Sequence, residues 1–212
     1  MNKTNWIIIL CILTFLLSWY LGNDVTAEWL GFSVINLFSG RVWTLITALF
    51  LHANVLHLIS NMLFLFVFGN VLEQDLGAEK TLSVFFTGGI LSFLLSTFFY
   101  SPSTLIIGAS AAIFSLTSVA MLVKPLKISL LFLMPLGLVA IIYFVYNLSA
   151  IYLGVEDNVA YISHILGFII GIPFGLGWST KWLRNLLIAI TLFGVYILAI
   201  FFLFPIISHF FF

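Results

Sequence analysis

The sequence predicts an all-α fold, a polytopic bundle of helices that span a membrane. Of the 212 residues, 63% are hydrophobic and only 7% are charged, whereas a soluble domain carries about 25% charged residues. Long apolar stretches recur along the chain without an attached polar domain or a low-complexity tract. Since a helix needs about 20 apolar residues to cross the hydrocarbon, each stretch is a candidate span.

Seven spans are expected, at residues 6–22, 53–73, 81–100, 106–123, 127–150, 159–178 and 183–205. The first follows Lys3 and resembles a signal peptide. Its apolar run is longer than usual, however, and no A-x-A cleavage site follows it, so we expect it to remain as a span. Residues 23–51 are too polar and too broken for a span, and their tryptophans favour the headgroup zone. We therefore expect this segment to be a membrane-associated outer loop.

The expected spans divide the chain into a six-helix core, residues 1–178, and a seventh helix with the C-terminus, residues 179–212. Basic residues predict a cytoplasmic N-terminus and an outer C-terminus, because cytoplasmic loops are enriched in Lys and Arg. In this orientation only Arg41 is basic and outside, and the inner basic residues are Lys3, Lys80, Lys124, Lys127, Lys181 and Arg184. The outer acids are Asp24, Glu28, Glu156 and Asp157. Short loops and the lack of a targeting segment suit a prokaryotic plasma membrane.

Several function classes find no support in the composition. The formal net charge is zero, so nothing suggests a nucleic-acid partner. The single cysteine, Cys11, cannot form an intramolecular disulfide, and there is no cysteine cluster for zinc or iron and sulfur. We expect Cys11 to be a small buried apolar residue, and we expect no cofactor.

Four polar residues stand out inside the expected spans, where polar groups are costly and commonly functional. They are His57, Asn61, Ser110 and His164. The spans that carry them all run inward from the outer face, and each residue lies within about 6–12 Å of that face at 1.5 Å rise per residue. The four therefore share one depth, as the members of a single site would.

Helical spacing separates the roles of the two histidines on the second span. His57 and Asn61 are four residues apart and share a face. His52 and His57 are five apart, which is about 140° around a helix. We therefore expect His52 to hydrogen-bond the outer loop and not to share the role of His57.

Small residues predict close contact between the fourth and sixth spans. Gly108 precedes Ser110 on the fourth, and Gly167 and Gly171 follow His164 on the sixth. On helices in such contact, a histidine can activate a serine as a nucleophile. Phe114, one turn below Ser110, is placed to pack against the imidazole. No Asp is positioned as a third member.

Acyl transfer also needs hydrogen-bond donors for the oxyanion. The side chains of His57 and Asn61 lie at the same depth as the serine. The backbone N–H of Ser110 is a third candidate, because the first amides of a helix have no intrahelical acceptor. Glu73 and Asp75, near the inner interface, are expected to be solvated or to cap a helix.

Other interpretations have less support. Taken singly, each small or polar residue fits helix packing. Zinc peptidases of the H-E-x-x-H type place two histidines four apart with a Glu between them, which His52 and His57 do not match. An aspartyl intramembrane protease would need a carboxylate in mid-membrane, and the expected spans contain none there. A transporter or channel would commonly show internal repeats, and none is evident.

The combined motifs resemble the rhomboid family of intramembrane serine proteases over about residues 30–178. His52, His57 and Asn61 resemble its H-x-x-x-x-H-x-x-x-N pattern, and residues 108–112 resemble its G-x-S-x-[GA] motif. His164 and Gly167 resemble the His-x-x-Gly of its sixth helix. Two positions differ: Thr44 follows Trp43 where the family often has Arg, and Ala111 stands where Gly is common.

The resemblance implies that Ser110 attacks the scissile carbonyl and that His164 acts as its general base and acid. His57, Asn61 and the Ser110 amide would form the oxyanion hole. Substrates would be single-pass membrane proteins with a locally unstable helix near the outer face, reaching the site past the fifth helix. A water-filled cavity would supply the hydrolytic water. The alternative is a catalytically inactive rhomboid-like protein that binds membrane clients. The resemblance leaves the oligomeric state open.

Overall fold

The computed structural model of the chain describes residues 1–155 and 159–211, so the predicted outer acids Glu156 and Asp157 lie outside the described residues. The elements in chain order are α1 (Lys3–Leu21), α2 (Asn23–Leu30), α3 (Val34–Phe38), α4 (Thr44–Thr47), the 3₁₀ turn η1 (Ala48–Phe50), α5 (Val55–Phe64), the π-helical turn η2 (Leu65–Gly69), α6 (Asn70–Leu76), α7 (Ala78–Ser96), α8 (Ser110–Val123), β1 (Ile128–Ser129), β2 (Met134–Pro135), α9 (Leu136–Tyr152), α10 (Tyr161–Trp178) and α11 (Trp182–Phe211).

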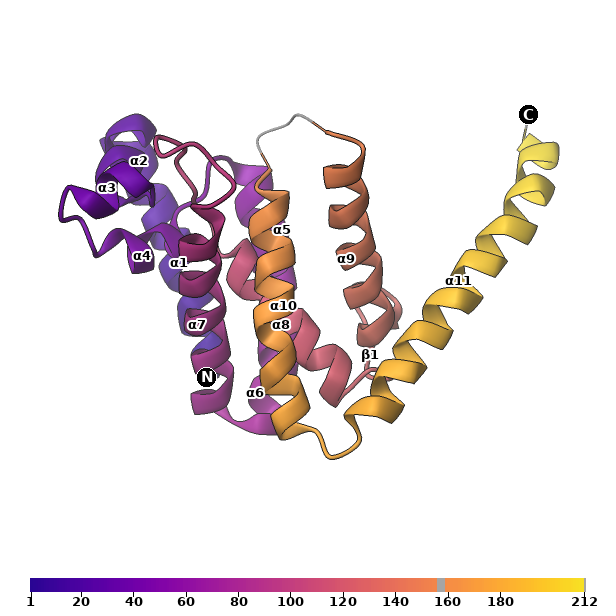
Figure 1. Cartoon of the computed structure of the whole chain (residues 1–212). Helices are drawn as coiled ribbons and strands as arrows, with labels where there is room; N and C mark the ends of the chain where they lie inside the picture. Colours follow the sequence, from indigo (N-terminus) through magenta and orange to yellow (C-terminus); the bar gives the residue numbers. More distant parts are fainter. Residues whose placement is uncertain (156–158, 212) are drawn as a thin grey trace.

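The predicted fold class is confirmed, because the molecule is a bundle of apolar helices (Figure 1). Within the described residues, five helices are long and apolar enough to cross a membrane: α1, the continuous α5-η2-α6 helix, α7, α10 and α11. Two further apolar helices, α8 with 14 residues and α9 with 17, are shorter. Together these helices correspond in order to the predicted spans, and the protein is a multi-pass membrane protein.

The segment predicted not to span, residues 23–51, folds into short helices beside the bundle (Figure 1). Arg41 contacts several parts of this segment. Its guanidinium lies 4.3 Å from the centre of the Trp29 ring and donates a 2.9 Å hydrogen bond to the carbonyl of Glu28. The indole of Trp43 donates to the carbonyl of Trp29 at 3.0 Å. Arg41 thus anchors this segment in a chain that has Thr44 after Trp43.

The predicted boundaries of the fourth and fifth spans are wrong. The fourth helix begins at Ser110 and not at residue 106, because Ile106 pairs in extended conformation with Phe32 through two backbone hydrogen bonds of 2.8 and 3.2 Å. The fifth begins at Leu136 and not at 127, because residues 128–135 form a β-hairpin. Its last residue is Pro135, whose fixed φ and missing N–H suit the position just before a helix.

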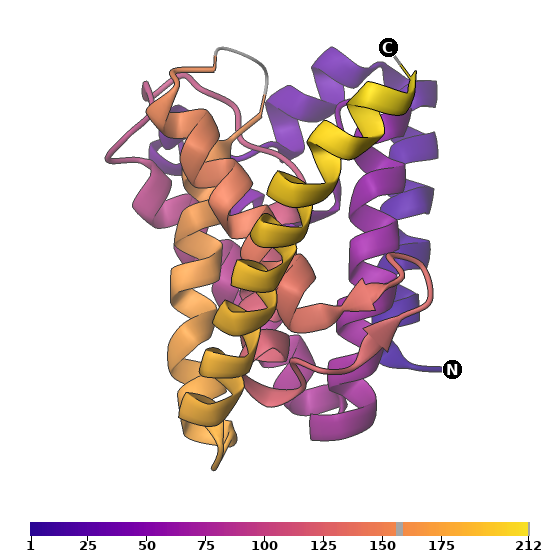
Figure 2. The same ribbon diagram turned by 90° about the vertical axis from the view of Figure 1, so that its right-hand side faces the viewer.

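Helix α8 lies at the centre of the bundle, and every residue from Ala111 to Leu122 is buried. Figure 2 shows it enclosed by its neighbours. Small residues allow this enclosure. A Cβ at Gly88 of α7 would overlap the side chain of Ser115, and one at Gly171 of α10 would overlap Ser118. Two neighbouring helices therefore pack closely against α8. The contact with α10 was predicted from the small residues, and the contact with α7 was not.

Side chains at one end of the bundle join α1, α6 and α8. The carboxylate of Glu73 accepts hydrogen bonds from the backbone N–H groups of Lys3 and Thr4, at 2.6 and 2.8 Å, and from the Thr4 hydroxyl at 2.7 Å. Glu73 therefore caps the first turn of α1, one of the two roles expected for it. Asp75 forms a 2.8 Å ion pair with Lys124, just beyond the end of α8.

The last helix leaves the bundle. Figure 1 shows α11 packed near its start and diverging from α9 toward its end. Only 6% of its most apolar 18-residue window is buried inside the protein. Its apolar surface is therefore available to lipid along most of its length.

Candidate active site

Ser110 is the first residue of α8, and the sequence-based expectation that it lies four residues inside the helix is wrong. The turn before it is made by Gly108, whose φ of +117° is rare for residues with a side chain. A Cβ at Gly108 would lie 2.9 Å from the Cε1 and Nε2 atoms of His57. Glycine at 108 therefore both allows the turn and leaves room for the imidazole. At this position in the helix, the N–H of Ser110 has no intrahelical acceptor.

His164 lies in the first turn of α10 and faces Ser110 across the helix interface. Its Nε2 atom is 2.8 Å from the Ser110 hydroxyl oxygen. The helices can approach this closely because Gly167 lies against the carbonyl of Ala111, where a Cβ would overlap the oxygen. The structure thus brings together two residues 54 positions apart in sequence.

The ring of Phe114 stacks on the imidazole of His164, with centroids 4.6 Å apart and an angle of 5° between the planes. Phe114 is one turn below Ser110 on α8, so the same helix carries the hydroxyl and the ring that orients its partner. Tyr161 approaches the imidazole edge-on from the other end of the same turn of α10, with centroids 6.5 Å apart.

The second nitrogen of His164 has a partner that the sequence analysis did not identify. Nδ1 lies 2.7 Å from the side-chain oxygen of Asn147 on α9. The amide nitrogen of Asn147 donates to the carbonyl of Tyr143 at 2.8 Å. An Asn inside an expected span is a costly group that commonly has a function, and this signal was available in the sequence.

His57 and Asn61 belong to α5, a different helix from the one that carries His164. Nδ1 of His57 accepts the backbone N–H of Ala53 at 3.4 Å, which leaves the proton on Nε2, the atom beside Gly108. One amide hydrogen of Asn61 is engaged by the carbonyl of His57 at 2.8 Å, and an amide nitrogen has two. Both side chains therefore retain an N–H donor, and both line the cavity described below.

His52 lies closer to His57 than helical spacing implied. The ring centroids are 5.1 Å apart, and the ring planes meet at 67°. The argument from 140° of rotation does not apply, because α5 begins at Val55 and His52 precedes it. Nδ1 of His52 pairs with the carbonyl of Phe50, the end of the outer segment, at 3.2 Å. Its Nε2 is buried and has no hydrogen-bond partner among the described residues.

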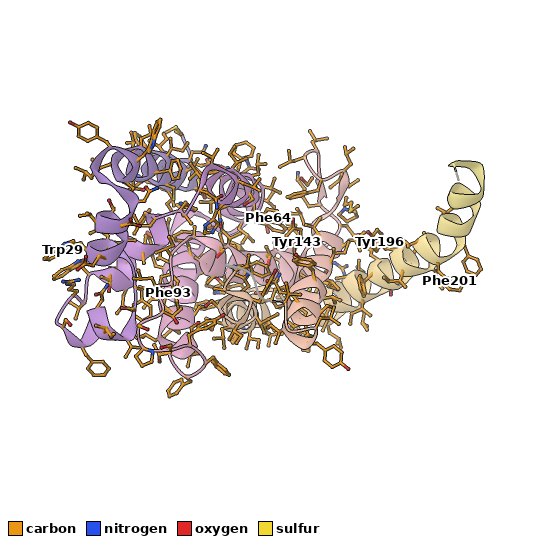
Figure 3. The ribbon with its side chains drawn as sticks, turned by 90° about the horizontal axis from the view of Figure 1, so that it is seen from above. Trp29, Phe64, Phe93, Tyr143, Tyr196 and Phe201 are labelled. Carbon is orange, nitrogen blue, oxygen red and sulfur yellow. The ribbon has the colours of Figure 1, made fainter. Side chains whose placement is uncertain are left out.

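A cavity of about 520 Å³ opens above these groups. Ser110, His164, His57, Asn61 and Phe114 all line it, together with residues of α5, α9 and the loop before α8. On one side, Phe64 of α5 and Tyr143 of α9 meet edge to face with centroids 4.3 Å apart. Figure 3 shows these two rings in contact between the helices. This aromatic pair links α5 and α9 beside the cavity.

The chemistry of the cavity is that of neutral polar groups. Among the described residues that line it there is no Lys, Arg, Asp or Glu, and in residues 1–155 and 159–211 no three His, Cys, Asp or Glu side chains cluster as metal ligands. The groups present are a hydroxyl bound to an imidazole and several N–H donors that line the same cavity. Such a set can carry out acyl transfer through a serine.

Comparison with known proteins places the chain in a family. The model of the Rhomboid domain matches residues 39–181. Among similar proteins, Rhomboid-like protease 3 of Toxoplasma gondii is 34% identical over 117 residues, which are 52% of this chain and 44% of that protein. RHOMBOID-like protein 7 of Arabidopsis thaliana is 36% identical over 76 residues, 36% of this chain and 24% of that protein. Rhomboid protease GlpG of Salmonella newport (strain SL254) is 24% identical over 102 residues, 48% and 37% of the two chains. The matched region is less than half the length of each relative.

Proposed function

This chain belongs to the rhomboid family, and we propose that it is an intramembrane serine endopeptidase that cleaves transmembrane segments of membrane proteins near the outer face. The observation that carries the proposal is the 2.8 Å contact between the Ser110 hydroxyl and Nε2 of His164, inside the cavity of about 520 Å³. The names of two relatives, which call them proteases, agree with it.

In the proposed reaction, Nε2 of His164 takes the proton of the Ser110 hydroxyl as the oxygen attacks the scissile carbonyl. The tetrahedral intermediate collapses when His164 gives this proton to the leaving amine, and the new N-terminus departs. The acyl group stays on Ser110 as an ester. A water molecule in the cavity then attacks the ester, again with His164 as the base, and frees the serine.

The oxyanion of each tetrahedral intermediate needs donors on the side of Ser110 away from His164. We assign this role to Nε2 of His57, the side-chain amide of Asn61 and the backbone N–H of Ser110. The lack of a side chain at Gly108 supports the assignment, because a Cβ there would lie 2.9 Å from Nε2 of His57 and 3.7 Å from the Ser110 hydroxyl oxygen. The start of α8 adds its dipole, which favours negative charge at a helix N-terminus.

The proposed substrates are single-pass membrane proteins whose helix is locally unstable near the outer face. They would reach Ser110 from the bilayer past α9. On this path the substrate would meet the rings of Phe64 and Tyr143, which are in contact with each other. The proposed orientation has a cytoplasmic N-terminus in a prokaryotic plasma membrane, with residues 1–178 as the protease core and residues 179–212 as an appended seventh helix. His52 would support the site through the outer segment.

Labelling with a fluorophosphonate tests the proposal, on detergent-solubilised wild type, Ser110→Ala and His164→Ala. We expect a covalent adduct on Ser110 in the wild type, none in Ser110→Ala, and almost none in His164→Ala. Thermal melting of each variant establishes that it is folded. A folded wild type that takes no label would overturn the proposal in favour of an inactive, client-binding rhomboid-like protein.

A further inference from the structure

Asn147 is a buried polar residue in the middle of an apolar helix. It is only 2% exposed, and it belongs to α9, a different helix from those that carry Ser110 and His164. An amide inside a membrane helix is costly unless its hydrogen bonds are made. Both ends of the Asn147 side chain are engaged, at 2.7 Å with His164 and at 2.8 Å with the carbonyl of Tyr143.

These two contacts fix which way the amide points. The carbonyl of Tyr143 can only accept, so it must face the NH₂ group of Asn147. The oxygen of Asn147 therefore faces Nδ1 of His164, and since that oxygen can only accept, Nδ1 must carry the proton. Nε2 is then unprotonated and accepts from the Ser110 hydroxyl at 2.8 Å. A single direction of donation runs from Ser110 through His164 to Asn147.

We propose that Asn147 is a positioning residue for His164, which makes the site a triad of Ser110, His164 and Asn147. The inference rests on the proposed protease function and extends it. The side-chain oxygen of Asn147 selects the imidazole tautomer that can act as a base. It also accepts a charge-assisted hydrogen bond once His164 has taken the serine proton, because an ionised donor bonds more strongly.

The stacking of Phe114 does not determine which nitrogen of His164 faces Ser110. A 180° flip about the Cβ–Cγ bond keeps the imidazole in nearly the same plane, so the stacked contact of 4.6 Å permits it. The flip would exchange Nδ1 and Nε2 for carbon atoms and break the hydrogen bonds to Asn147 and Ser110. Phe114 therefore holds the plane of the ring, and Asn147 holds its orientation within that plane.

A neutral amide fits this location better than a carboxylate. An ionised Asp inside the membrane would itself have to be paired or solvated, and the described residues lining the cavity include no cation. Asn147 supplies the acceptor without adding a charge. It would supply the acceptor for His164 in a site whose described lining includes no Asp or Glu.

The test compares Asn147→Leu and Asn147→Ala, which remove the acceptor, with Asn147→Asp, which keeps it. Asn185→Ala is the matched control. Asn185 is also a buried asparagine, but its amide bonds the carbonyls of Leu122 and Val123 at the far end of α8 from Ser110. Cleavage of a transmembrane substrate is measured for kcat and KM, with thermal melting alongside.

We expect Asn147→Leu and Asn147→Ala to lower kcat about 10- to 100-fold with KM within about twofold, a smaller loss than the roughly 10⁴-fold caused by a wrong tautomer in a Ser-His-Asp triad. Asn147→Asp keeps an acceptor for His164 but loses the donor to Tyr143, so it should lose less kcat than these two variants and still fall below wild type. Asn185→Ala should lower the melting temperature and leave kcat unchanged.

The inference is overturned if wild type cleaves and a folded Asn147→Leu or Asn147→Ala keeps kcat within about twofold of it. It is also overturned if Asn185→Ala loses as much kcat for the same loss of melting temperature, since the effect would then be structural. A wild type that neither cleaves nor takes a serine label instead refutes the proposed function on which the inference rests.

Discussion

Gly167 of α10 lies against the carbonyl oxygen of Ala111 of α8, so closely that a methyl group at position 167 would overlap that oxygen. Ala111 directly follows Ser110, and His164 precedes Gly167 by three residues, about one turn. The distance between the proposed nucleophile and its base is therefore set by a contact between two backbones, next to Ser110 on α8 and one turn from His164 on α10.

Gly167→Ala should separate α8 from α10 and damage both stability and activity. Overpacking a dense interior costs about 1–3 kcal/mol, and a shift of about 1 Å at a reacting group costs roughly 100-fold in rate. Gly177→Ala is the control on the same helix, because a Cβ there meets nothing within 4 Å. Melting temperature and kcat of the two variants check the prediction, and equal behaviour would contradict it.

Asn61→Ala should lower kcat about 100- to 1000-fold, the usual effect of removing one oxyanion donor. KM should change little, because the bound substrate carries no oxyanion, which forms only as the serine attacks. Asn61 also bonds the carbonyl of His57 within its own helix, so stability is measured in parallel. Turnover at the wild-type rate would show that Asn61 only packs.

Phe64→Ala should speed the cleavage of a transmembrane substrate. The edge-to-face pair with Tyr143 links α5 and α9 on the proposed path of the substrate. Such a pair is worth about 0.5–1.5 kcal/mol, or roughly 2- to 10-fold in kcat/KM. Labelling by a small soluble fluorophosphonate should be unchanged. Phe66→Ala, at an exposed position two residues on, is the control. A loss of membrane-substrate cleavage in Phe64→Ala would contradict the prediction.

Glu73→Ala should destabilise the fold and leave the chemistry intact. The carboxylate caps α1 through the N–H groups of Lys3 and Thr4, and loss of a helix cap costs about 0.5–2 kcal/mol. Denaturation in detergent measures the loss, against Gln74→Ala at the exposed neighbouring position. A drop in kcat for folded Glu73→Ala would show that this end of the bundle communicates with the site.

Apolar runs predicted the order of the helices. In lipid every backbone N–H and C=O group needs a hydrogen-bond partner within the protein, so a long apolar run folds as a helix. They did not reveal the hairpin at residues 128–135. Its residues are as apolar as those of a helix, and its turn depends on the left-handed conformation of Leu133, with φ of +53°, which no pattern of residue types signals. The start of the fourth helix was also misjudged, because the pairing of Ile106 with Phe32 joins segments far apart in sequence.

The pairing of Ser110 with His164 was predictable because depth and small residues both follow from the sequence. Asn147 was missed for a physical reason. Which face of α9 turns toward His164 depends on how three helices pack, and an apolar helix surrounded by other helices carries little amphipathic signal to show it. The predicted separation of His52 from His57 was wrong for a similar reason. The angle of about 140° between them applies only if both residues lie on one helix, and α5 begins after His52.

The shortness of α8 has a consequence for the lipid. Fourteen residues rise about 21 Å, whereas the hydrocarbon is about 30 Å thick. If the end of α8 near Lys124 is held at one boundary, the hydroxyl of Ser110 lies about 9 Å inside the other. A bilayer with longer acyl chains would bury it further, and a thinner one would raise it toward the headgroups. Membrane thickness would then help to select which peptide bond of a substrate is cut.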